Sequence, residues 1–398
     1  MNSDSTNDNY NINSIIGIDW EFILINNPIF KYLSKYELLD LSLTSKRLRS
    51  KISPRLFNTL RINNKVLYSQ PNFFQHKNNF ELDRLTYWEK IRLLSTHSFD
   101  KNILFKETQI DPFINQSAAT LRKVANYCKV LNLYELKNSS YFLIPIATEF
   151  LNLTQFYIYN CELPLYRFNV ILTKLVKLEI LHLDIVQFLK SSEDSDLAND
   201  VNFPQSLKAL NYERILLVIT DSPQLNTIDF TYNLIPVSNS TLLGLPVKHL
   251  PKLELLSYGK RDNSQSLTKF LEINPQLKSL CLTIALLTPA SLSTITSMPN
   301  LERLKIETNG TYFEEFNIPS SPNLEQLKDL FLYITTESDF NLINQFIKFT
   351  PNLTQLTIRT KANEQFEIFD KLVDSLKYFT KSTETRAKFN SITKIYYK

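Results

Sequence analysis

The sequence predicts an α/β protein with a small helical module at the amino terminus and a curved array of repeats behind it. Each repeat is expected to supply one strand and one helix, with the strands forming a parallel sheet on the concave face. Three observations lead to this fold. An apolar pattern recurs about every 25 residues over 128–398, helical periodicity fills the intervals, and residues 15–62 show a separate, capped helical pattern.

The repeating unit is an apolar residue, two variable residues, a second apolar residue, one variable residue and a third apolar residue. Leu277, Leu280 and Leu282 form one such unit. The units begin at Cys128, Leu153, Leu178, Leu207, Leu225, Leu253, Leu277, Leu301, Leu327 and Leu353. This spacing predicts about ten repeats. The interval from Leu207 to Leu225 is too short for a strand, a helix and two turns, so one register assignment there conflicts with the pattern.

The intervals and the carboxyl-terminal segment complete the predicted array. Helical periodicity is clearest over residues 266–274 and 340–349, and the polar, acidic run 191–196 is expected to be a solvated loop. Residues 380–398 are expected to form a last strand or a cap. A single unit buries too little apolar surface to offset its loss of conformational entropy, so neighbouring units must stack.

The amino-terminal part divides into three segments. Residues 1–14 are dominated by Asn, Ser and Asp and are expected to be a disordered tail. Residues 15–62 predict a helical bundle, because Ser34 followed three residues later by Glu37 has the spacing of a capping box. Residues 63–127 are a connecting helical segment or early divergent repeats, with an amphipathic helix expected over 81–94.

The helical module resembles an F-box, a motif that docks on the Skp-type adaptor of cullin ubiquitin ligases. The resemblance rests on apolar, basic and proline positions spread over residues 29–57. The adaptor-binding residues that it implies are Ile29, Phe30, Leu33, Leu38, Leu41, Leu43, Ser45, Arg47, Leu48 and Pro54.

The repeats resemble a leucine-rich-repeat array, whose consensus places Leu at the three apolar positions and Asn or Cys three residues later, as at Cys161. An F-box followed by such an array implies a substrate-recognition adaptor of a Skp/cullin/F-box ligase that does no chemistry itself. Its partners would be the Skp-type adaptor with its cullin complex and a protein target, and we expect a monomer outside that complex. The alternative is a non-catalytic scaffold whose front module only caps the array, which the lack of a Leu-Pro pair at the start of the module favours.

The sequence contains no recognisable catalytic, metal-binding or cofactor-binding motif. The four histidines, His76, His97, His182 and His249, lie far apart without the spacing of a metal motif. Four glycines in 398 residues leave no Gly-rich phosphate loop. We therefore expect no catalytic residues, no metal and no cofactor. A net charge of +4 also argues against nucleic acid, including an RNA-binding array, as the partner.

Strand alternation predicts which side chains face the partner, because residues between the buried leucines must point to the other side of the sheet. The set includes aromatic residues, which are enriched at protein interfaces, and a basic group that could steer a charged target. The predicted target-binding residues are Tyr134, Tyr157, Tyr159, His182, Arg303, Lys305, Phe331, Tyr333 and Arg359. The same alternation places Asn211, Glu213, Asp229, Thr231, Ser257 and Thr283 on this side.

The cysteine content and the hydropathy of the sequence indicate the cellular compartment. Three widely spaced cysteines, Cys128, Cys161 and Cys281, give no disulfide framework and favour a reducing environment. Cys128 and Cys161 occupy apolar repeat positions and are expected to be buried thiols. The first residues lack a secretory pattern, and Ser- and Thr-rich residues 279–301 contain two prolines, so no membrane span is expected. A cytoplasmic or nuclear protein is predicted.

Overall fold

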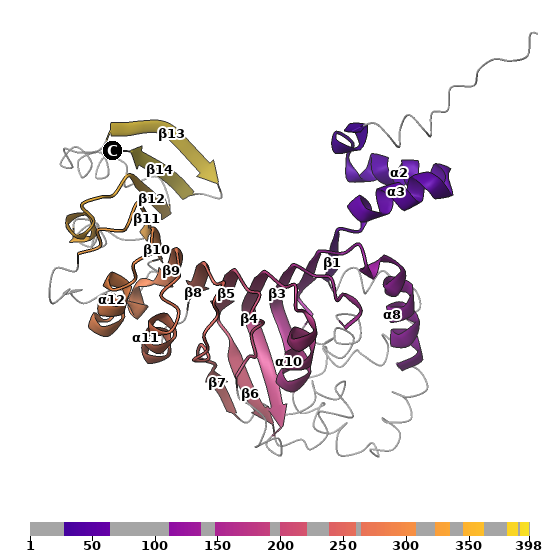
Figure 1. Cartoon of the computed structure of the whole chain (residues 1–398), viewed down its shortest axis with the longest axis horizontal. Coiled ribbons are helices and arrows are strands. Elements are labelled where there is room, and N and C mark those ends of the chain that lie inside the picture. Colours follow the sequence, from indigo (N-terminus) through magenta and orange to yellow (C-terminus); the bar gives the residue numbers. More distant parts are fainter. Residues whose placement is uncertain are drawn as a thin grey trace, which may run out of the picture. The chain divides into compact units, whose positions relative to one another are not determined.

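The computed structural model describes residues 28–63, 111–136, 148–191, 200–220, 239–259, 264–307, 323–334, 345–361, 380–388 and 391–397 (Figure 1). The chain divides into two compact units, one ending at Asn58 and the other beginning at Thr59. The expectations for residues 1–14, 81–94, 192–196 and 340–344 lie outside the described residues. The described residues form a mixed α/β structure with a mostly parallel, open sheet.

The first unit contains a short 3-10 helix, η1 (Pro28–Lys31), and two α-helices, α2 (Lys35–Thr44) and α3 (Lys46–Leu56). The predicted capping box at the start of α2 is confirmed. The Glu37 amide donates to Ser34 Oγ at 3.3 Å, and the Ser34 amide donates to Glu37 Oε2 at 2.6 Å. Ser45 ends α2 and caps α3, because its Oγ accepts from the Leu48 amide at 3.0 Å. Two helices with one shared cap residue therefore follow directly from the sequence.

A small apolar core holds the first unit together. Its buried residues are Phe30, Leu38, Leu48, Ile52 and Leu56, with Leu33, Leu41 and Phe57 packed against them. The Arg55 guanidinium lies 5.7 Å from the centre of the Phe30 ring. Arg49 Nε donates to the Ser42 carbonyl at 3.0 Å, which satisfies a carbonyl in the last turn of α2.

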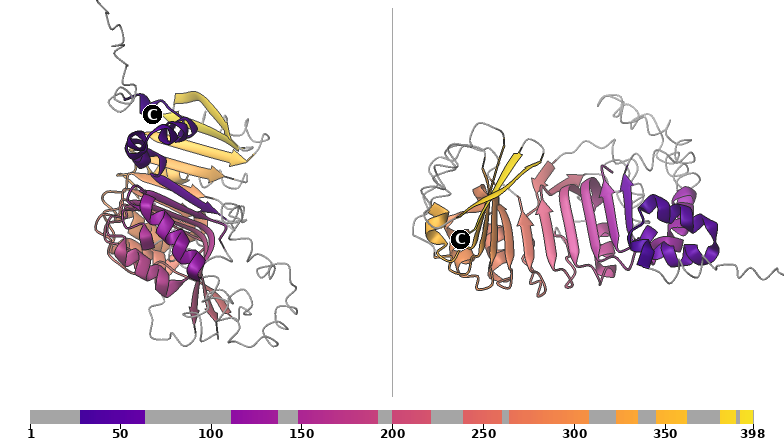
Figure 2. Two further views of the ribbon diagram at one scale, coloured as in Figure 1. Left: turned by 90° about the vertical axis from the view of Figure 1, so that its right-hand side faces the viewer. Right: turned by 90° about the horizontal axis from the view of Figure 1, so that it is seen from above.

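The second unit is built on one sheet whose main path contains parallel strands from β1 to β12 (Figures 1 and 2). The strands are β1 (Thr59–Asn63), β2 (Val130–Tyr134), β3 (Gln155–Pro164), β4 (Ile180–Ser191), β5 (Ala209–Glu213), β8 (Leu255–Tyr258), β9 (Ser279–Thr283), β10 (Arg303–Glu307), β11 (Asp329–Ile334) and β12 (Gln355–Lys361). Neighbours in this order are hydrogen-bonded to one another. Strand β1 extends the sheet before Cys128, where the pattern placed the first repeat.

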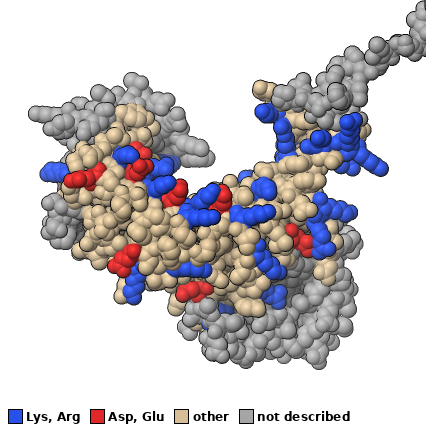
Figure 3. Space-filling model, viewed as in Figure 1, with Lys and Arg blue, Asp and Glu red and all other residues tan. Residues whose placement is uncertain are grey.

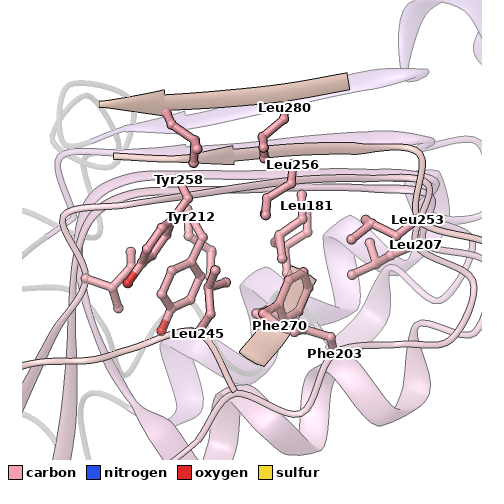
Figure 4. Packing of buried hydrophobic residues seen from close by; sticks show 14 of the residues in the cluster. Leu181, Phe203, Leu207, Tyr212, Leu245, Leu253, Leu256, Tyr258, Phe270 and Leu280 are labelled. Carbon is pink, nitrogen blue, oxygen red and sulfur yellow. The ribbon is translucent and has the colours of Figure 1, made fainter. Parts of the chain in front are cut away.

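The strands pair in a constant register, so equivalent residues of successive repeats form straight columns across the sheet. Leu256 of β8 aligns with Leu210 of β5 and with Leu280 of β9. These leucines are buried, and Figure 4 shows Leu181, Leu256 and Leu280 projecting to the same side of the sheet. Two columns of apolar side chains, at alternate strand positions, thus form the main core.

The register conflict between Leu207 and Leu253 is settled by the pairing of the strands. Strand β5 pairs directly with β8, and the Leu255 amide donates to the Lys208 carbonyl at 3.0 Å. No strand therefore lies between β5 and β8 in this sheet, and Leu225, where a repeat strand was expected, lies outside the described residues. The chain between β5 and β8 instead contributes β6 (Leu216–Thr220), parallel to β4, and β7 (Asn239–Leu242), antiparallel to β6.

Helices connect several strands and lie on one side of the sheet (Figure 1). They are α8 (Asp111–Ala125), α10 (Leu165–Lys174), α11 (Ser264–Glu272), the 3-10 helix η6 (Ile284–Leu286) and α12 (Pro289–Thr296). The helix predicted over 266–274 is confirmed as α11, which buries Leu267, Phe270 and Leu271. Of the helix predicted over 340–349, residues 345–349 are helical.

A left-handed residue recurs at the equivalent position of four successive strands, directly after β2 and β5 and inside the longer β3 and β4. Glu135, Asn160, Ile185 and Arg214 have φ angles between 51° and 55°, and each follows the last outward-pointing residue of its strand segment. The next residues, Leu136, Cys161, Val186 and Ile215, are buried. The left-handed conformation costs about 1–2 kcal/mol for a non-glycine residue. Burial of the following side chain in the core offsets this cost, which explains the recurrence.

The carboxyl-terminal strand prediction is confirmed. Strand β13 (Thr380–Lys388) pairs antiparallel with β14 (Ser391–Tyr397), and β14 pairs antiparallel with β12. The parallel ladder thus passes into an antiparallel hairpin. Tyr396 of β14 is fully buried against the main core.

Two adjacent leucines of β8 provide a test of the buried column. Leu256 is fully buried, whereas Leu255 is 38% exposed. We predict that Leu256→Ala lowers the free energy of unfolding by about 2–5 kcal/mol, because it leaves a cavity between two strands. Leu255→Ala is the matched control and should lower it by less than about 1 kcal/mol. Denaturant unfolding followed by circular dichroism measures both; equal losses would contradict the assigned register.

Candidate functional site

The candidate site is the open face of the sheet, defined as the side opposite the buried leucine columns. It consists of two columns of side chains that alternate with those leucines. The middle column contains Arg61, Asn132, Tyr157, His182, Asn211, Ser257, Cys281, Lys305, Phe331 and Thr357. The end column contains Asn63, Tyr134, Tyr159, Asp184, Glu213, Thr283, Glu307, Tyr333 and Arg359. The predicted alternation is confirmed, although Asp229 and Thr231 lie outside the described residues.

An aromatic group occupies the part of the open face formed by β2, β3 and β4. The Tyr134 and Tyr159 ring centres are 5.7 Å apart, and Tyr157 and His182 are separated by the same distance. Arg61 adds a cation 5.8 Å from the Tyr134 ring centre. All four rings are half-buried, so each keeps an accessible surface while its neighbours limit its motion. Rings held in this way suit contact with a partner, because little side-chain entropy remains to be lost.

His182 differs electrostatically from an exposed histidine. Burial lowers the pKa of His182 below its ordinary value, and the nearby carboxylates of Asp184 and Glu213 only partly oppose this effect. Asp184 is itself paired with Arg214 at 2.7 Å. The imidazole is therefore mainly neutral at pH 7 and presents an aromatic, hydrogen-bonding surface instead of a positive charge.

Polar side chains form the centre of the open face, on β5 and β8. Glu213 Oε1 accepts hydrogen bonds from Ser257 Oγ at 2.9 Å and from Asn211 Nδ2 at 3.0 Å. The Glu213 side chain lies over Gly259, where an added Cβ would come within 3.1 Å of Glu213 Cγ. The position of this carboxylate is thus set by two donors and by a residue without a side chain.

Cys281 and Lys305 continue the middle column on β9 and β10. Burial raises the pKa of the Cys281 thiol, although Lys305 partly opposes this shift. Burial alone would lower the pKa of Lys305, but Cys281, Glu307 and Glu213 together raise it. Lys305 Nζ contacts Glu307 Oε1 at 2.6 Å, so a charged pair lies beside a neutral thiol. The sequence prediction missed Cys281, although the alternation that found Lys305 also places it on this face.

Cation and ring pairs mark the part of the face on β10, β11 and β12. Lys305 Nζ lies 5.2 Å from the Phe331 ring centre, and the Arg359 guanidinium lies 5.7 Å from that of Tyr333. Arg303 is exposed at the start of β10. The structure therefore brings the predicted residues together in two groups, with the Glu213 centre between them.

The predicted adaptor-binding residues fall into two classes. Phe30, Leu38 and Leu48 are buried in the core of the first unit, and Leu33 and Leu41 pack against that core. Ser45 acts as a helix cap, whereas Leu43, Arg47 and Pro54 are exposed. The side chain of Ile29 lies outside the described residues. The buried residues stabilise the fold of the module, so direct contact with an adaptor would have to involve the exposed residues.

An exposed apolar stripe on the first unit was not predicted. Tyr32 is 84% exposed, Tyr36 83%, Leu39 47% and Leu43 66%. Their spacing of three and four residues places them along one side of α2 and the turn before it. The signal was present in the sequence, since these residues alternate with the buried ones at helical spacing.

The described residues contain little that indicates other chemistry. Among them, no group of three or more metal-binding side chains comes together. Cys128 and Cys161 are buried, and burial raises the pKa of Cys161 to about 12, which makes that thiol unreactive. No described helix has the length and apolar character needed to cross a membrane. No protein-family model matches the chain, and a search of curated proteins finds no match.

The environment of His182 predicts a pH effect on stability. Its pKa is lower in the folded chain than in the unfolded chain, so the unfolded state binds protons more readily. The contribution of His182 to stability therefore falls as the pH drops below about 6.5, the ordinary value for histidine. We predict that His182→Gln reduces the loss of stability between pH 8 and pH 5.5, as measured by urea unfolding at each pH. An unchanged pH dependence would contradict the burial of this ring.

Proposed function

We propose that this chain is a non-catalytic substrate-recognition adaptor: its first unit docks on a Skp-type adaptor of a cullin ubiquitin ligase, and the open face binds a protein target. The observation that supports this most strongly is the presence, in one chain, of a capped two-helix module with an exposed apolar stripe and a long sheet with an aromatic open face. The order of the two parts resembles an F-box followed by leucine-rich repeats.

The surface of the first unit supports docking on an acidic partner. The apolar stripe places four exposed large side chains, Tyr32, Tyr36, Leu39 and Leu43, side by side, and contiguous exposed apolar surface is typical of interaction sites. Lys and Arg side chains gather over the same unit (Figure 3). Over residues 28–58, the described part of this unit, the basic residues are Lys31, Lys35, Lys46, Arg47, Arg49, Lys51 and Arg55, against the acidic residues Glu37 and Asp40. This charge excess would steer a negatively charged partner toward the stripe.

The open face supports capture of a protein. Its aromatic and cation-ring groups lie on consecutive strands and are held by neighbouring side chains. Such surfaces bind through area and shape complementarity, and they need no bond-making residues. An adaptor of this kind accelerates modification by raising the effective concentration of the target near the transfer enzyme. The short link between the units, in which α3 ends at Leu56 and β1 begins at Thr59, suits this role.

A pull-down with a purified Skp-type adaptor tests the proposal. We predict that the wild-type chain forms a stable complex and that Leu43→Asp weakens it at least about tenfold, because a charge would replace an exposed apolar contact. Val176→Asp is the matched control, since Val176 is 69% exposed in the second unit and should tolerate the same change. Circular dichroism should show that both variants remain folded.

Two outcomes would count against the proposal. A folded wild-type chain that fails to bind the adaptor at micromolar concentration would favour the scaffold alternative, in which the first unit serves only as a cap. Equal binding by the wild type and the Leu43 variant would show that the stripe is not the docking surface.

A further inference from the structure

Glu213, at the centre of the open face, is held in position by neutral donors among the described residues. Ser257 Oγ and Asn211 Nδ2 both donate to its Oε1 atom, at 2.9 and 3.0 Å. Lys305 interacts with Glu213 only at longer range, because Lys305 pairs with Glu307, and Arg214 pairs with Asp184. Within the described part of the chain, no Lys or Arg lies at ion-pair distance from Glu213. A half-buried carboxylate is therefore fixed by neutral donors and keeps its second oxygen, Oε2, for another contact.

Gly259 creates the space that this carboxylate occupies. An ideal Cβ at position 259 would lie 3.1 Å from Glu213 Cγ, 3.3 Å from its Cδ and 3.4 Å from its Oε2. Any larger side chain would push the carboxylate away from the sheet. The chain has only four glycines, so the presence of one beside Glu213 indicates a site that is shaped for this side chain.

Two buried oxygens, one on β5 and one on β9, have no hydrogen-bond partner. Asn211 Oδ1 and Thr283 Oγ1 are both buried and unpaired. Thr283 is only 4% exposed. Tyr258 pairs with Leu282, so the next residues along the two strands, Gly259 and Thr283, lie opposite each other. Both oxygens lack accessible surface, so a ligand on the open face contacts Glu213 Oε2 and not these two atoms.

We propose that Glu213 and its neighbours form a subsite for a basic side chain, Lys or Arg, of the protein target. An ammonium or guanidinium group supplies N–H donors and one positive charge, which match the negative charge of Glu213 and its Oε2 atom. A divalent cation fits less well, because hard cations of this kind need about six or more oxygen ligands, and the site offers a single carboxylate. This inference rests on the proposed target-binding role of the open face.

A peptide array tests the subsite. The probes are short random peptides with one fixed central residue, which is Lys, Arg, acetyl-lysine or Gln, and the full chain is applied in solution. We expect wild-type protein to retain the Lys and Arg sets about tenfold more strongly than the acetyl-lysine and Gln sets, as for a hydrogen-bonded charge pair. Glu213→Gln should abolish this preference, and Gly259→Ala should reduce it by displacing the carboxylate.

Control variants separate this subsite from the rest of the open face. Glu254→Gln removes an exposed carboxylate that pairs with Lys278 at 3.0 Å outside the open face, and it should keep the full preference. Tyr157→Ala should weaken retention of all four peptide sets equally, because it removes general contact area.

The outcomes distinguish failure of the subsite from failure of the face. If the wild type shows no preference for basic peptides but the Tyr157 variant still loses general retention, the subsite is overturned and the target-binding face remains supported. A preference that survives in a folded Glu213→Gln variant would also overturn it. Failure of the folded wild type to retain any peptide would overturn both.

Discussion

The structure depends on the constant register between neighbouring strands of the second unit. A repeat of about 25 residues cannot bury enough apolar surface alone, so each strand is stable only when its leucines lie between those of its neighbours. Leu256, between Leu210 and Leu280, shows this arrangement. The left-handed residues at the equivalent position of four strands belong to the same constraint, since the next side chain points back into the core.

The open face is a consequence of that core. Once alternate side chains are committed to burial, the remaining ones must point to the other side of every strand, where they form columns as regular as the leucines. The face is consequently assembled from single residues of many repeats, as with Tyr157, Glu213 and Lys305. Substitutions there can change the partner without disturbing the leucine columns, which suits a surface whose role is recognition.

Much of the fold follows from sequence, because its periodicity is local. The leucine pattern, the capping box at Ser34 and the alternation that exposes His182 can be read along the chain. The direct pairing of β5 with β8 could not be predicted, since an apolar pattern does not show which strands are neighbours, and the residues after Leu225 lie outside the described residues. Alternation placed Glu213 on the open face, but its hydrogen bonds and its contact with Gly259 could not be predicted, because the fold and not the spacing brings β5 and Gly259 together.

Disulfide trapping between β8 and β9 tests the register most directly. Ser257 aligns with Cys281 on the open face, so Ser257→Cys places two thiols on adjacent strands with Cα atoms about 5 Å apart. We expect mild oxidation to link position 257 to Cys281, as mapped by mass spectrometry. Leu255→Cys, which aligns with Ser279, should not form this link. Equal linkage from position 255, or none from position 257 in the folded chain, would contradict the account.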